Sequence, residues 1–494
     1  GKLVCGPEDS EISEVVTDSR GTLPRNSLFV AIRGEKFDGH DFVEEAIDRG
    51  AAAALVSDRS CVADSEGVCL IEVDDTVDGL QRLAAGWRDF FDIPVVGITG
   101  SNGKTIVKDM LAGMLARDRT VHRSPGSYNS QIGVPITVLG MRPEHEVAVI
   151  EAGISRVDEM DALEEIIRPT HGILTNIGLA HAAGLPTLEI TAREKLKLFR
   201  RIDGPLVFPG DADVLRDFDL PAERRAFRAE CSSADEPSDL YCAEDIYEID
   251  GATGVRLHRP GIPTIDLQIN APGRHNVANA AAAAALAVEL GVTDENIRDG
   301  LAAYEPNPMR LEMHTTRTGV TLINDAYSSD PVSARAALSV LEQYAGDKRT
   351  VAILGDMRDL GARTEADHRR LGEVVGRGGV EHLICYGELA RHAGESAAAN
   401  GLPEEHLDYV ESMDQLDDLL DQRLRSGDVV LFKGSRTLGL ERAAERLLES
   451  VAPARLRIDL EAIRANYHAL RRHVGEDVGF IAVVKSFGYG NDSA

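Results

Sequence analysis

The stretch GITGSNGKT, from Gly97 to Thr105, decides the fold of the central part of this 494-residue chain. It ends the apolar run IPVVGITG (93–100) and leads into KTIVKDMLAGMLA (104–116), where apolar residues recur at helical spacing. A buried strand, a glycine-rich turn and a helix in this order are typical of a phosphate-binding loop. The glycine spacing departs from the usual pattern, but small residues still let backbone N–H groups turn towards an anion.

The residue types in this loop indicate a nucleotide and a magnesium ion as ligands. The helix that begins near Lys104 directs its positive dipole end at phosphate. Lys104 supplies a point charge for the β- and γ-phosphates, and Thr105 supplies a hydroxyl for Mg²⁺. A purely structural turn would not need Gly-Lys-Thr at the start of a helix. We therefore predict that the nucleotide is bound by Thr99, Gly100, Ser101, Asn102, Gly103, Lys104 and Thr105.

Composition limits the classes of partner. The chain has 53 Lys and Arg against 82 Asp and Glu, a net charge of −29, which argues against nucleic acid and anionic membrane as general partners. We expect no membrane insertion, because no apolar run reaches about 18 residues, and residues 1–20 show no signal-peptide pattern. The six cysteines form no Cys-x-x-Cys pair, so we expect reduced thiols in a cytoplasmic protein.

Strand and helix patterns alternate along most of the chain and predict an α/β fold. Before Phe91, a strand over 27–34 is followed by a helix, a glycine stop and a second strand within 41–58. Buried strands are expected over 148–153 and 172–178, and a helix over 276–290. Parallel strands separated by helices predict a sheet covered on both faces.

After Pro308 the pattern begins again and predicts a second, smaller doubly wound domain. A helix over 440–451 closes this domain, and residues 452–455 are a candidate linker. The strands that alternate with helices in this part are expected over 321–325, 350–356, 382–387 and 428–434.

The order of the short motifs resembles that of the Mur ligases, which are ATP-dependent amide-forming enzymes of peptidoglycan synthesis. The phosphate loop G-x-T-G-small-N-G-K-T is the first of these motifs. The other stretches that resemble the family, in the family's order, are TDSR (17–20), LFVAIRGEKFDGHDF (28–42), SYNSQIGVP (127–135), EAGIS (151–155), NIGLAH (176–181), PGRHNVANA (272–280), NDAYSSDP (324–331), LGDMRDLG (354–361) and FKGSRTLGLE (432–441).

The resemblance covers about residues 1–450 and implies a three-domain fold. We expect a UDP-precursor module over 1–91, a central phosphate-loop ATPase domain over 92–308 and a Rossmann-like domain over 309–451. The branch that it most resembles adds D-alanyl-D-alanine to UDP-N-acetylmuramoyl-tripeptide through an acyl phosphate, with ATP and Mg²⁺. The ligase part is expected to be a monomer.

Four residues are the catalytic candidates. Glu151 ends an apolar strand, where ligands of a parallel sheet bind, and it joins Thr105 as a candidate metal ligand. By resemblance, His181 helps to bind a second metal, and Lys195 is carbamylated by CO₂ and stabilises metal binding as an anion. The residues alone do not choose Lys195 over Lys197. Lys104 completes the set.

The remaining site residues are assigned by resemblance. Asn276 and Asn279 are expected on the base side of ATP, and Arg310 and Asp325 near its phosphate and ribose. For UDP-N-acetylmuramoyl-tripeptide and D-alanyl-D-alanine, the candidates are Asp18, Ser19, Arg20, Asp38, Gly39, His40, Asn129, Tyr327, Ser328, Asp330, Lys433, Ser435 and Arg436.

The last 40 residues resemble a different family. RIDLEAIRANYHAL and AVVKSFGYG, within 456–494, are similar to the opening of an alanine racemase. In that family the lysine after the first barrel strand carries pyridoxal phosphate, and Lys485 matches it. A barrel needs about 200 residues or more, so we expect only an incomplete TIM-barrel fragment without racemase activity. The full-length parent is expected to be a bifunctional ligase and racemase.

Several alternatives stay open. Another Mur-type ligase could add a different residue, such as the third of the stem peptide. A folylpolyglutamate synthase lacks a UDP-sugar module, so the DSR and DGH motifs argue against it. A plain ATPase or kinase would need no amine acceptor. The catalytic candidates together disfavour a scaffold that only binds nucleotide, and chain length disfavours a racemase.

Overall fold

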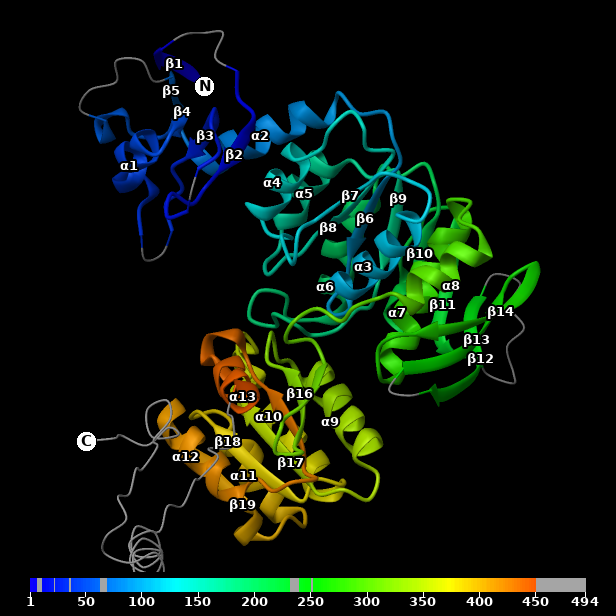
Figure 1. The fold of residues 1–494 in the computed structure, drawn as a ribbon. Coiled ribbons are helices and arrows are strands. Elements are labelled where there is room, and N and C mark those ends of the chain that lie inside the picture. The colour runs from blue at the N-terminus through cyan, green and yellow to red at the C-terminus, as the bar shows by residue number, and fades with distance from the viewer. Residues whose placement is uncertain are drawn as a thin grey trace, which may run out of the picture. The chain divides into compact units, whose positions relative to one another are not determined.

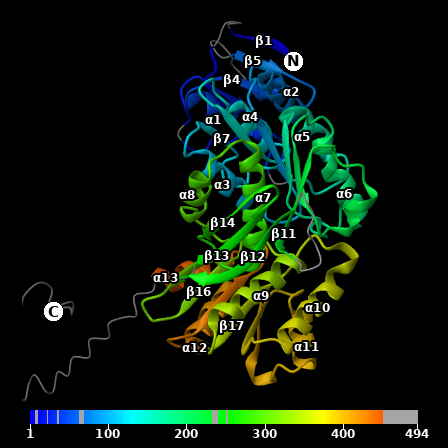
Figure 2. The same ribbon diagram turned by 90° about the vertical axis from the view of Figure 1, so that its right-hand side faces the viewer.

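The computed structural model describes residues 1–6, 11–21, 23–34, 37–62, 69–231, 240–249 and 252–449. Their strands form three separate sheets with helices packed on them (Figures 1 and 2). Residues Gly1–Leu448 make up one compact unit, and Glu449–Ala494 make up a second. The expected barrel fragment over 456–494 and its Lys485 lie outside the described residues.

The first sheet has five strands in the order β1-β5-β4-β3-β2, with β1 antiparallel to β5 and the other neighbours parallel. The expected strand at 27–34 and the strand and helix within 41–58 are confirmed, with shorter bounds. Its elements are β1 Lys2–Cys5, β2 Glu14–Val16, β3 Ser27–Val30, α1 Val43–Asp48, β4 Ala51–Val56, β5 Cys69–Glu72 and α2 Thr76–Arg88.

The central sheet has nine strands in the order β14-β13-β12-β11-β10-β9-β6-β8-β7. Strand β6 lies between β8 and β9, and all five of its residues are buried because helices cover both faces. Its parallel part and helices are β6 Val95–Thr99, α3 Lys104–Leu115, β7 Val121–Arg123, α4 Gly133–Leu139, β8 Val147–Glu151, α5 Glu159–Ile167, β9 His171–Leu174, α6 Leu188–Leu196, β10 Leu206–Pro209, β11 Arg224–Glu230, α7 Arg274–Glu289 and α8 Asp294–Ala302.

Two features of this sheet differ from the sequence expectations. Strands β12 (Leu240–Ile249), β13 (Ala252–Arg259) and β14 (Ile262–Ile269) extend the parallel sheet as an antiparallel meander. The expectation that every cysteine is reduced is wrong for Cys231 and Cys242, which form a disulfide. Strands β11 and β12 pair side by side, and this brings the Cα atoms of Cys231 and Cys242 within 5.1 Å of each other. The sequence separation of 11 residues does not indicate this pairing.

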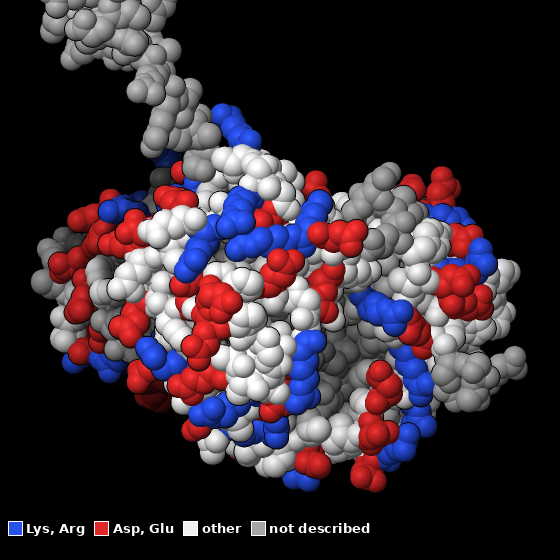
Figure 3. All heavy atoms as spheres, turned by 90° about the horizontal axis from the view of Figure 1, so that it is seen from below, with Lys and Arg blue, Asp and Glu red and all other residues white. Residues whose placement is uncertain are grey.

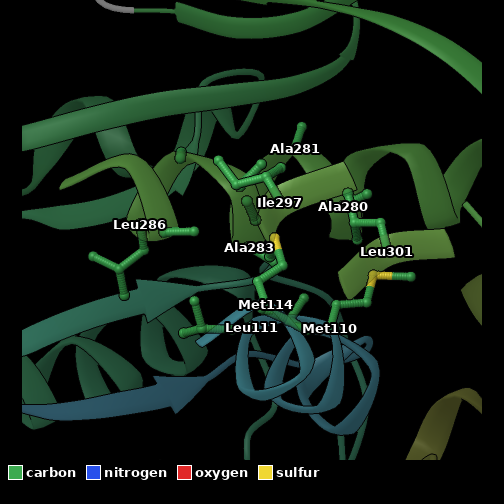
Figure 4. Packing of buried hydrophobic residues seen from close by; sticks show 14 of the residues in the cluster. Met110, Leu111, Met114, Ala280, Ala281, Ala283, Leu286, Ile297 and Leu301 are labelled. Carbon is green, nitrogen blue, oxygen red and sulfur yellow. The ribbon is translucent and has the colours of Figure 1, made fainter. Parts of the chain in front are cut away.

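The largest hydrophobic cluster lies under the phosphate-loop helix. Met110, Leu111 and Met114 of α3 pack on the alanine-rich α7 and on Ile297 and Leu301 of α8, as Figure 4 shows. Short alanine side chains let the helix backbones approach closely. A Cβ at Gly300 of α8 would lie 2.6 Å from the Met114 Cα, so this crossing requires glycine. The close packing of α3 on α7 and α8 therefore fixes the position of the helix that follows the phosphate loop.

The third sheet has six strands in the order β15-β16-β20-β17-β18-β19, with only β15 antiparallel to its neighbour. The four strands expected after Pro308 are confirmed as β16, β17, β18 and β20. The elements are β15 Glu312–Thr315, β16 Thr321–Asp325, α9 Pro331–Ala345, β17 Thr350–Gly355, α10 Thr364–Arg377, β18 His382–Tyr386, α11 Arg391–Ala399, β19 Leu407–Val410, α12 Met413–Arg423, β20 Val429–Lys433 and α13 Leu440–Glu449.

Charge on the surface is mixed. On the face shown in Figure 3, basic and acidic side chains lie close to one another, and the chain has many exposed ion pairs of the kind that joins Arg446 to Asp421 at 3.0 Å. In the described part of the chain, no helix combines the length and the apolar character needed to cross a membrane.

Candidate active site

The phosphate loop joins β6 to α3 and is held in place by the loop after β9. The Ser101 hydroxyl donates to the Gly178 carbonyl at 2.9 Å and accepts from its N–H at 2.8 Å. The Asn102 N–H donates to Asn176 Oδ1 at 2.8 Å. Gly103 has φ 80°, and a Cβ there would collide with Asn279 Oδ1 from α7, so glycine is required for two reasons.

Lys104 is the first residue of α3 and folds back over its own loop. Its Nζ donates to the carbonyls of Gly100 at 3.0 Å and Ser101 at 3.3 Å. Burial lowers the pKa of Lys104, and nearby Arg310 lowers it further, while Glu151 opposes the shift. A phosphate group bound in the loop would restore the stability of the charged ammonium.

Glu151 ends β8 and is fully buried. Its Oε1 accepts from the Asn129 amide at 2.5 Å, and its backbone N–H donates to Ser124 Oγ at 3.0 Å. Within the described residues, Oε2 is buried without a hydrogen-bond partner, as is Thr99 Oγ1 at the end of β6. An orphaned carboxylate oxygen close enough to Lys104 to act on its pKa fits Mg²⁺, which prefers hard oxygen ligands.

Lys195 and Lys197 lie two residues apart at the end of α6 but in opposite environments. Lys195 is 3% exposed, and in the described part of the chain its ammonium has no hydrogen bond or ion pair. Burial, reinforced by Lys104, holds the pKa of Lys195 well below its usual value. An amine that is neutral at physiological pH can react with CO₂, which an ammonium cannot do.

Lys197 is surrounded by carboxylates. Its Nζ lies 2.7 Å from Asp161, 2.8 Å from Glu194 and 3.0 Å from Asp158. Burial lowers the pKa of Lys197, but these hydrogen bonds outweigh burial and raise it above its ordinary value. The same three carboxylates lie close enough together to suggest a metal site, but Lys197 is the cation that they hold.

His181 lies in the loop after β9, in the left-handed backbone region at φ 59°. Its Nδ1 is 3.9 Å from Asp359 Oδ2 of the third-sheet region, and the Ala183 N–H donates to the Asp359 carbonyl at 3.0 Å. Burial lowers the pKa of His181, and Lys104 and Lys195 lower it further. A neutral imidazole can act as a metal ligand.

The two asparagines of α7 have different surroundings. Asn276 is buried, and its amide donates to the Pro272 carbonyl at 2.7 Å, which holds the first turn of α7 to the residues before it. Asn279 donates to Asn276 Oδ1 at 3.2 Å and turns its own Oδ1 towards Gly103. Of the pair, Asn279 is therefore the one that borders the phosphate loop.

Asp325 and Lys433 form a buried pair at the ends of neighbouring strands β16 and β20. Their side chains are 3.0 Å apart, and Asp325 Oδ1 also accepts from the Leu311 N–H at 3.2 Å. Burial raises the pKa of Asp325, and Lys433 opposes this. Lys433 also donates to the Ser328 carbonyl. Both residues were expected to contact ligands. In the structure they form an ion pair with each other, and the ligand contacts stay a prediction.

The loop over 327–330 carries the expected dipeptide contacts. The Tyr327 ring lies between two guanidinium groups, with Arg310 at 4.1 Å and Arg436 at 5.2 Å from its centroid. Asp330 caps α9 by accepting from the N–H groups of Val332 and Ser333, and it also accepts from the Asn102 amide at 3.3 Å. The loop therefore reaches the phosphate loop.

Ser328 and Ser435 complete this side of the site. The Ser328 side chain is exposed. The Ser435 hydroxyl lies 3.1 Å from Thr437 Oγ1, and its N–H donates to the Asp356 carbonyl at 3.3 Å. The exposed Ser328 side chain remains available to a ligand.

The candidates of the N-terminal module are paired with one another. The exposed Arg20 bonds to Asp18 at 2.7 Å, which lowers the pKa of Asp18 to about 2. Arg49 donates to the carbonyl of the buried Ser19 at 3.0 Å. These two observations show a turn that is held internally.

His40 is buried and has both ring nitrogens engaged. Asp38 lies 2.6 Å from Nδ1, and Nε2 accepts from the Ser57 N–H at 2.9 Å. A Cβ at Gly39 would lie 2.5 Å from the Ile32 nitrogen. The geometry therefore supports a structural role for His40 and Gly39, and the predicted precursor contact stays a prediction.

Sequence reasoning missed two residues near the phosphate loop, Lys108 on α3 and Ser127 in the loop after β7. Lys108 is buried on α3 and donates to the carbonyls of Ser124 at 2.9 Å and Gly126 at 2.5 Å. The Ser127 hydroxyl accepts from Arg310 at 3.0 Å and lies 3.4 Å from Thr105 Oγ1. The spacing of Lys108, one helical turn after Lys104, is the one signal that could have indicated it.

Three family models match the chain. The Mur ligase middle domain matches residues 98–287, the "Mur ligase, glutamate ligase domain" matches 309–436, and the "Mur ligase family, catalytic domain" matches 11–88. A UDP-N-acetylmuramoyl-tripeptide–D-alanyl-D-alanine ligase from Bacillus subtilis (strain 168) is 35% identical over 445 residues, which are 90% of this chain and 94% of the relative. The chain belongs to the Mur ligase family. This Mur ligase is therefore an ATP-dependent enzyme.

Other relatives agree with this assignment. The Escherichia coli (strain K12) ligase of the same name is 34% identical over 445 residues, covering 90% of this Mur ligase and 95% of the relative. The crystal structure of MurF from Acinetobacter baumannii has a TM-score of 0.78 at 27% identity, covering 90% and 94% of the two chains. The Thermotoga maritima MurF ligase in complex with ADP has a TM-score of 0.76 at 25% identity, covering 90% and 99%.

Proposed function

We propose that this Mur ligase joins D-alanyl-D-alanine to UDP-N-acetylmuramoyl-tripeptide at the expense of ATP. The observation that carries the proposal is a pair of polar groups near Lys104 that have no partner among the described residues: the buried Glu151 Oε2, and the ammonium of Lys195, a residue that is 3% exposed. Such groups are costly in a fold unless a ligand completes them. The names of the relatives from Bacillus subtilis and Escherichia coli support the choice of substrates.

The proposed reaction has two steps. A carboxylate oxygen of the tripeptide attacks the γ-phosphorus of ATP, and ADP leaves, which produces an acyl phosphate. The amine of D-alanyl-D-alanine then attacks the acyl carbon, inorganic phosphate leaves with the C–O bond electrons, and the new amide loses a proton. In this scheme the protein mainly positions the reactants and stabilises charge.

Lys104 and the backbone of the loop over 99–105 hold the phosphates in this proposal. Asn279 borders the loop from α7, with Asn276 fixing its orientation. When bound, Mg²⁺ would neutralise the phosphate oxygens. Thr105 and Glu151 would hold it with hydroxyl and carboxylate oxygens, and His181 would help to hold a second metal ion, with a carbamate on Lys195 stabilising metal binding as an anion.

The carbamate assignment rests on the contrast between the two lysines of α6. Burial lowers the pKa of Lys195, which favours loss of its proton, and the deprotonated amine can attack CO₂ and lose a second proton to become an anion near Lys104. Lys197 is already neutralised by three carboxylates. We therefore propose Lys195, and not Lys197, as the carbamylated residue.

For the acceptor site and the precursor site we propose a smaller set of residues than for the nucleotide site. Asn129, Tyr327, Ser328 and Arg436 are proposed for the incoming dipeptide and the reaction centre, and Asp18 and Arg20 for the UDP group. We propose domain boundaries at 1–91, 92–308 and 309–451. The proposed location is the cytoplasm. Disulfides are rare there, so alkylation of Cys231 and Cys242 in intact cells is a direct test of that location.

The decisive experiment measures phosphate release from ATP and Mg²⁺ with UDP-N-acetylmuramoyl-tripeptide, with and without D-alanyl-D-alanine. The proposal predicts release that requires both substrates and a UDP-pentapeptide product of matching mass. Release that occurs without the dipeptide contradicts the proposal. If a single amino acid replaces the dipeptide as the better acceptor, the enzyme is instead another Mur-type ligase, which is the alternative function.

For the segment over 456–494 we propose the start of an alanine racemase in the parent protein. This proposal rests on sequence resemblance alone, because Lys485 lies outside the described residues. A complete racemase domain would bind pyridoxal phosphate through Lys485. Borohydride reduction followed by peptide mapping of the longer protein would show whether the cofactor is attached at Lys485.

A further inference from the structure

Arg310 is presented by an unusual backbone. Its two neighbours, Met309 at φ 60° and Leu311 at φ 52°, both lie in the left-handed region that bulky residues rarely occupy. Surrounding bonds maintain this strain. The Met309 N–H donates to Glu312 at 3.0 Å, and the Leu311 N–H donates to the buried Asp325 at 3.2 Å. Strain held in this way is typical of functional segments.

The Arg310 guanidinium is held on two sides. Its face stacks on the Tyr327 ring, with 4.1 Å between the guanidinium carbon and the ring centroid. Its Nη2 donates to Ser127 Oγ at 3.0 Å. In the described part of the chain, Arg310 has no carboxylate partner, although the protein carries an excess of acidic residues. The guanidinium is therefore fixed in place with its charge still available to an anion.

Ser127 also faces the hydroxyl of Thr105. The two side-chain oxygens are 3.4 Å apart, which is long for a hydrogen bond between hydroxyls. Among the described residues, Ser127 is the only hydrogen-bonding partner of the Thr105 hydroxyl. If Thr105 turns a lone pair to a metal ion, its O–H must donate elsewhere, and Ser127 Oγ is the acceptor within reach.

A serine oxygen has two lone pairs and one proton. Ser127 can therefore accept from Arg310 and from Thr105 at the same time and still donate its own proton to a phosphate oxygen. The residues just before Ser127 are held in place, because the buried Lys108 ammonium donates to the Ser124 and Gly126 carbonyls of the same loop. Ser127 thus links Thr105 and Arg310, which the sequence analysis treated separately.

We propose that Ser127 is a positioning residue that couples metal binding at Thr105 to the placement of the Arg310 guanidinium at the nucleotide phosphates. The inference rests on the proposed function, since it assumes that the loop binds Mg²⁺ with the nucleotide. It adds a residue and a linkage to that function. When Mg²⁺ is present, the chain of contacts Thr105–Ser127–Arg310 orders a cation that would otherwise be placed by Tyr327 alone.

The test measures the dissociation constant of ADP by isothermal titration calorimetry on the full chain, with and without MgCl₂. The ratio of the two constants is the metal linkage. Ser127→Ala is expected to reduce this ratio about tenfold, because losing a group that orients a metal ligand typically costs that much affinity. Ser127→Thr, which keeps the hydroxyl, is expected to retain the linkage.

Ser130→Ala is the matched control. Ser130 lies three residues further along the same loop. Among the described residues, its hydroxyl accepts only from the N–H groups at the start of α4, at 3.2 Å from Gly133 and 3.4 Å from Ile132. Its metal linkage should equal that of the wild type. Ser127→Cys keeps the volume but accepts hydrogen bonds poorly, so it tests the proposal even if the alanine variant does not fold.

Coupling with Arg310 provides a second measurement. Adding Ser127→Ala to Arg310→Lys should cost no further linkage, because the two side chains act through one contact. The proposal is overturned if Ser127→Ala and Ser127→Cys behave like Ser130→Ala, if the effects of the two substitutions add, or if ADP binding ignores Mg²⁺. These titrations need neither precursor nor dipeptide, so failure of the substrate assignment would leave their outcome intact.

Discussion

The carboxyl edge of the central sheet and the turns of the N-terminal sheet both carry residues of family motifs. The two regions differ in whether the polar side chains of these residues have hydrogen-bond partners. At the central edge, the buried Glu151 Oε2 and the ammonium of the buried Lys195 have no partner within the described part of the chain. In the N-terminal turns, Asp18 pairs with Arg20, and His40 is bonded to Asp38 and Ser57. The central edge therefore leaves polar groups for the ligand that we propose, whereas the polar groups of the N-terminal turns are paired within the fold.

This difference shows how to weigh a motif residue. A buried polar group costs free energy unless it is paired, so an unpaired one indicates chemistry. A group that is fully satisfied within the fold contributes to stability, and its retention needs no ligand. The same rule separates Lys195 from Lys197 and separates Arg310, which keeps its charge free, from Lys433, which is paired with Asp325.

The largest expected effect concerns the two lysines of α6. Lys195→Ala should reduce kcat about 10²–10³-fold, because it removes a charged group at the metal and phosphate site. Lys197→Ala should leave kcat within about threefold, since its ammonium is paired with Asp158, Asp161 and Glu194 and with no group of the phosphate loop among the described residues. Steady-state phosphate release checks both. Partial recovery of Lys195→Ala by short carboxylic acids would support the carbamate, and a severe loss in Lys197→Ala alone would reverse the assignment.

A test of the N-terminal side uses His40→Ala. Removing a buried ring that bonds Asp38 and Ser57 should lower the free energy of unfolding by about 2 kcal/mol. The KM for the UDP precursor should stay within about twofold, because the ring has no nitrogen left for a ligand. Urea unfolding and steady-state kinetics measure the two quantities. A large rise in KM at unchanged stability would break the comparison.

Acid sensitivity should arise from buried imidazoles near the site. Burial and the nearby Lys433 lower the pKa of His275 from 6.5 to about 4. Above pH 6.5 the ring is neutral in both states, and its contribution to stability is complete. Between pH 6.5 and 4, the unfolded chain binds a proton at this ring and the folded chain does not, so the free energy of unfolding falls by about 3 kcal/mol. Below pH 4 the loss stops.

Urea unfolding at a series of pH values measures this loss, with His275→Gln as the matched variant. The glutamine variant should lack the corresponding part of the slope. An equal slope in the two proteins would show that His275 does not titrate in this way.

The smallest expected effect is on the stability of the Arg20→Ala variant. The Asp18–Arg20 pair is exposed, so its loss should leave the melting temperature unchanged. If Arg20 contacts the UDP group as proposed, the KM of the precursor should rise several-fold. A drop in melting temperature without a change in KM would assign this pair to folding and would extend the comparison to it.

Local patterns in the sequence predicted the parallel strands and the phosphate loop well. Strands β6, β8, β16, β17, β18 and β20 are short apolar runs between glycines and helices, and this signal needs no tertiary information. The meander β12–β14 and the disulfide between Cys231 and Cys242 were missed, because both depend on which strands pair. Ser127 and Lys108 were missed because their partners lie on other segments.

The sequence by itself determined the succession of strands and helices, the phosphate loop from Gly97 to Thr105 and the family motifs. These depend on residues that are close along the chain. Only the tertiary structure decided which motif residues are free to act. Side chains two positions apart in a helical backbone point about 200° away from each other. Lys195 therefore faces the buried edge of the sheet, while Lys197 bonds to Asp158, Asp161 and Glu194. Burial and pairing are set by packing between distant segments, and no local pattern records them.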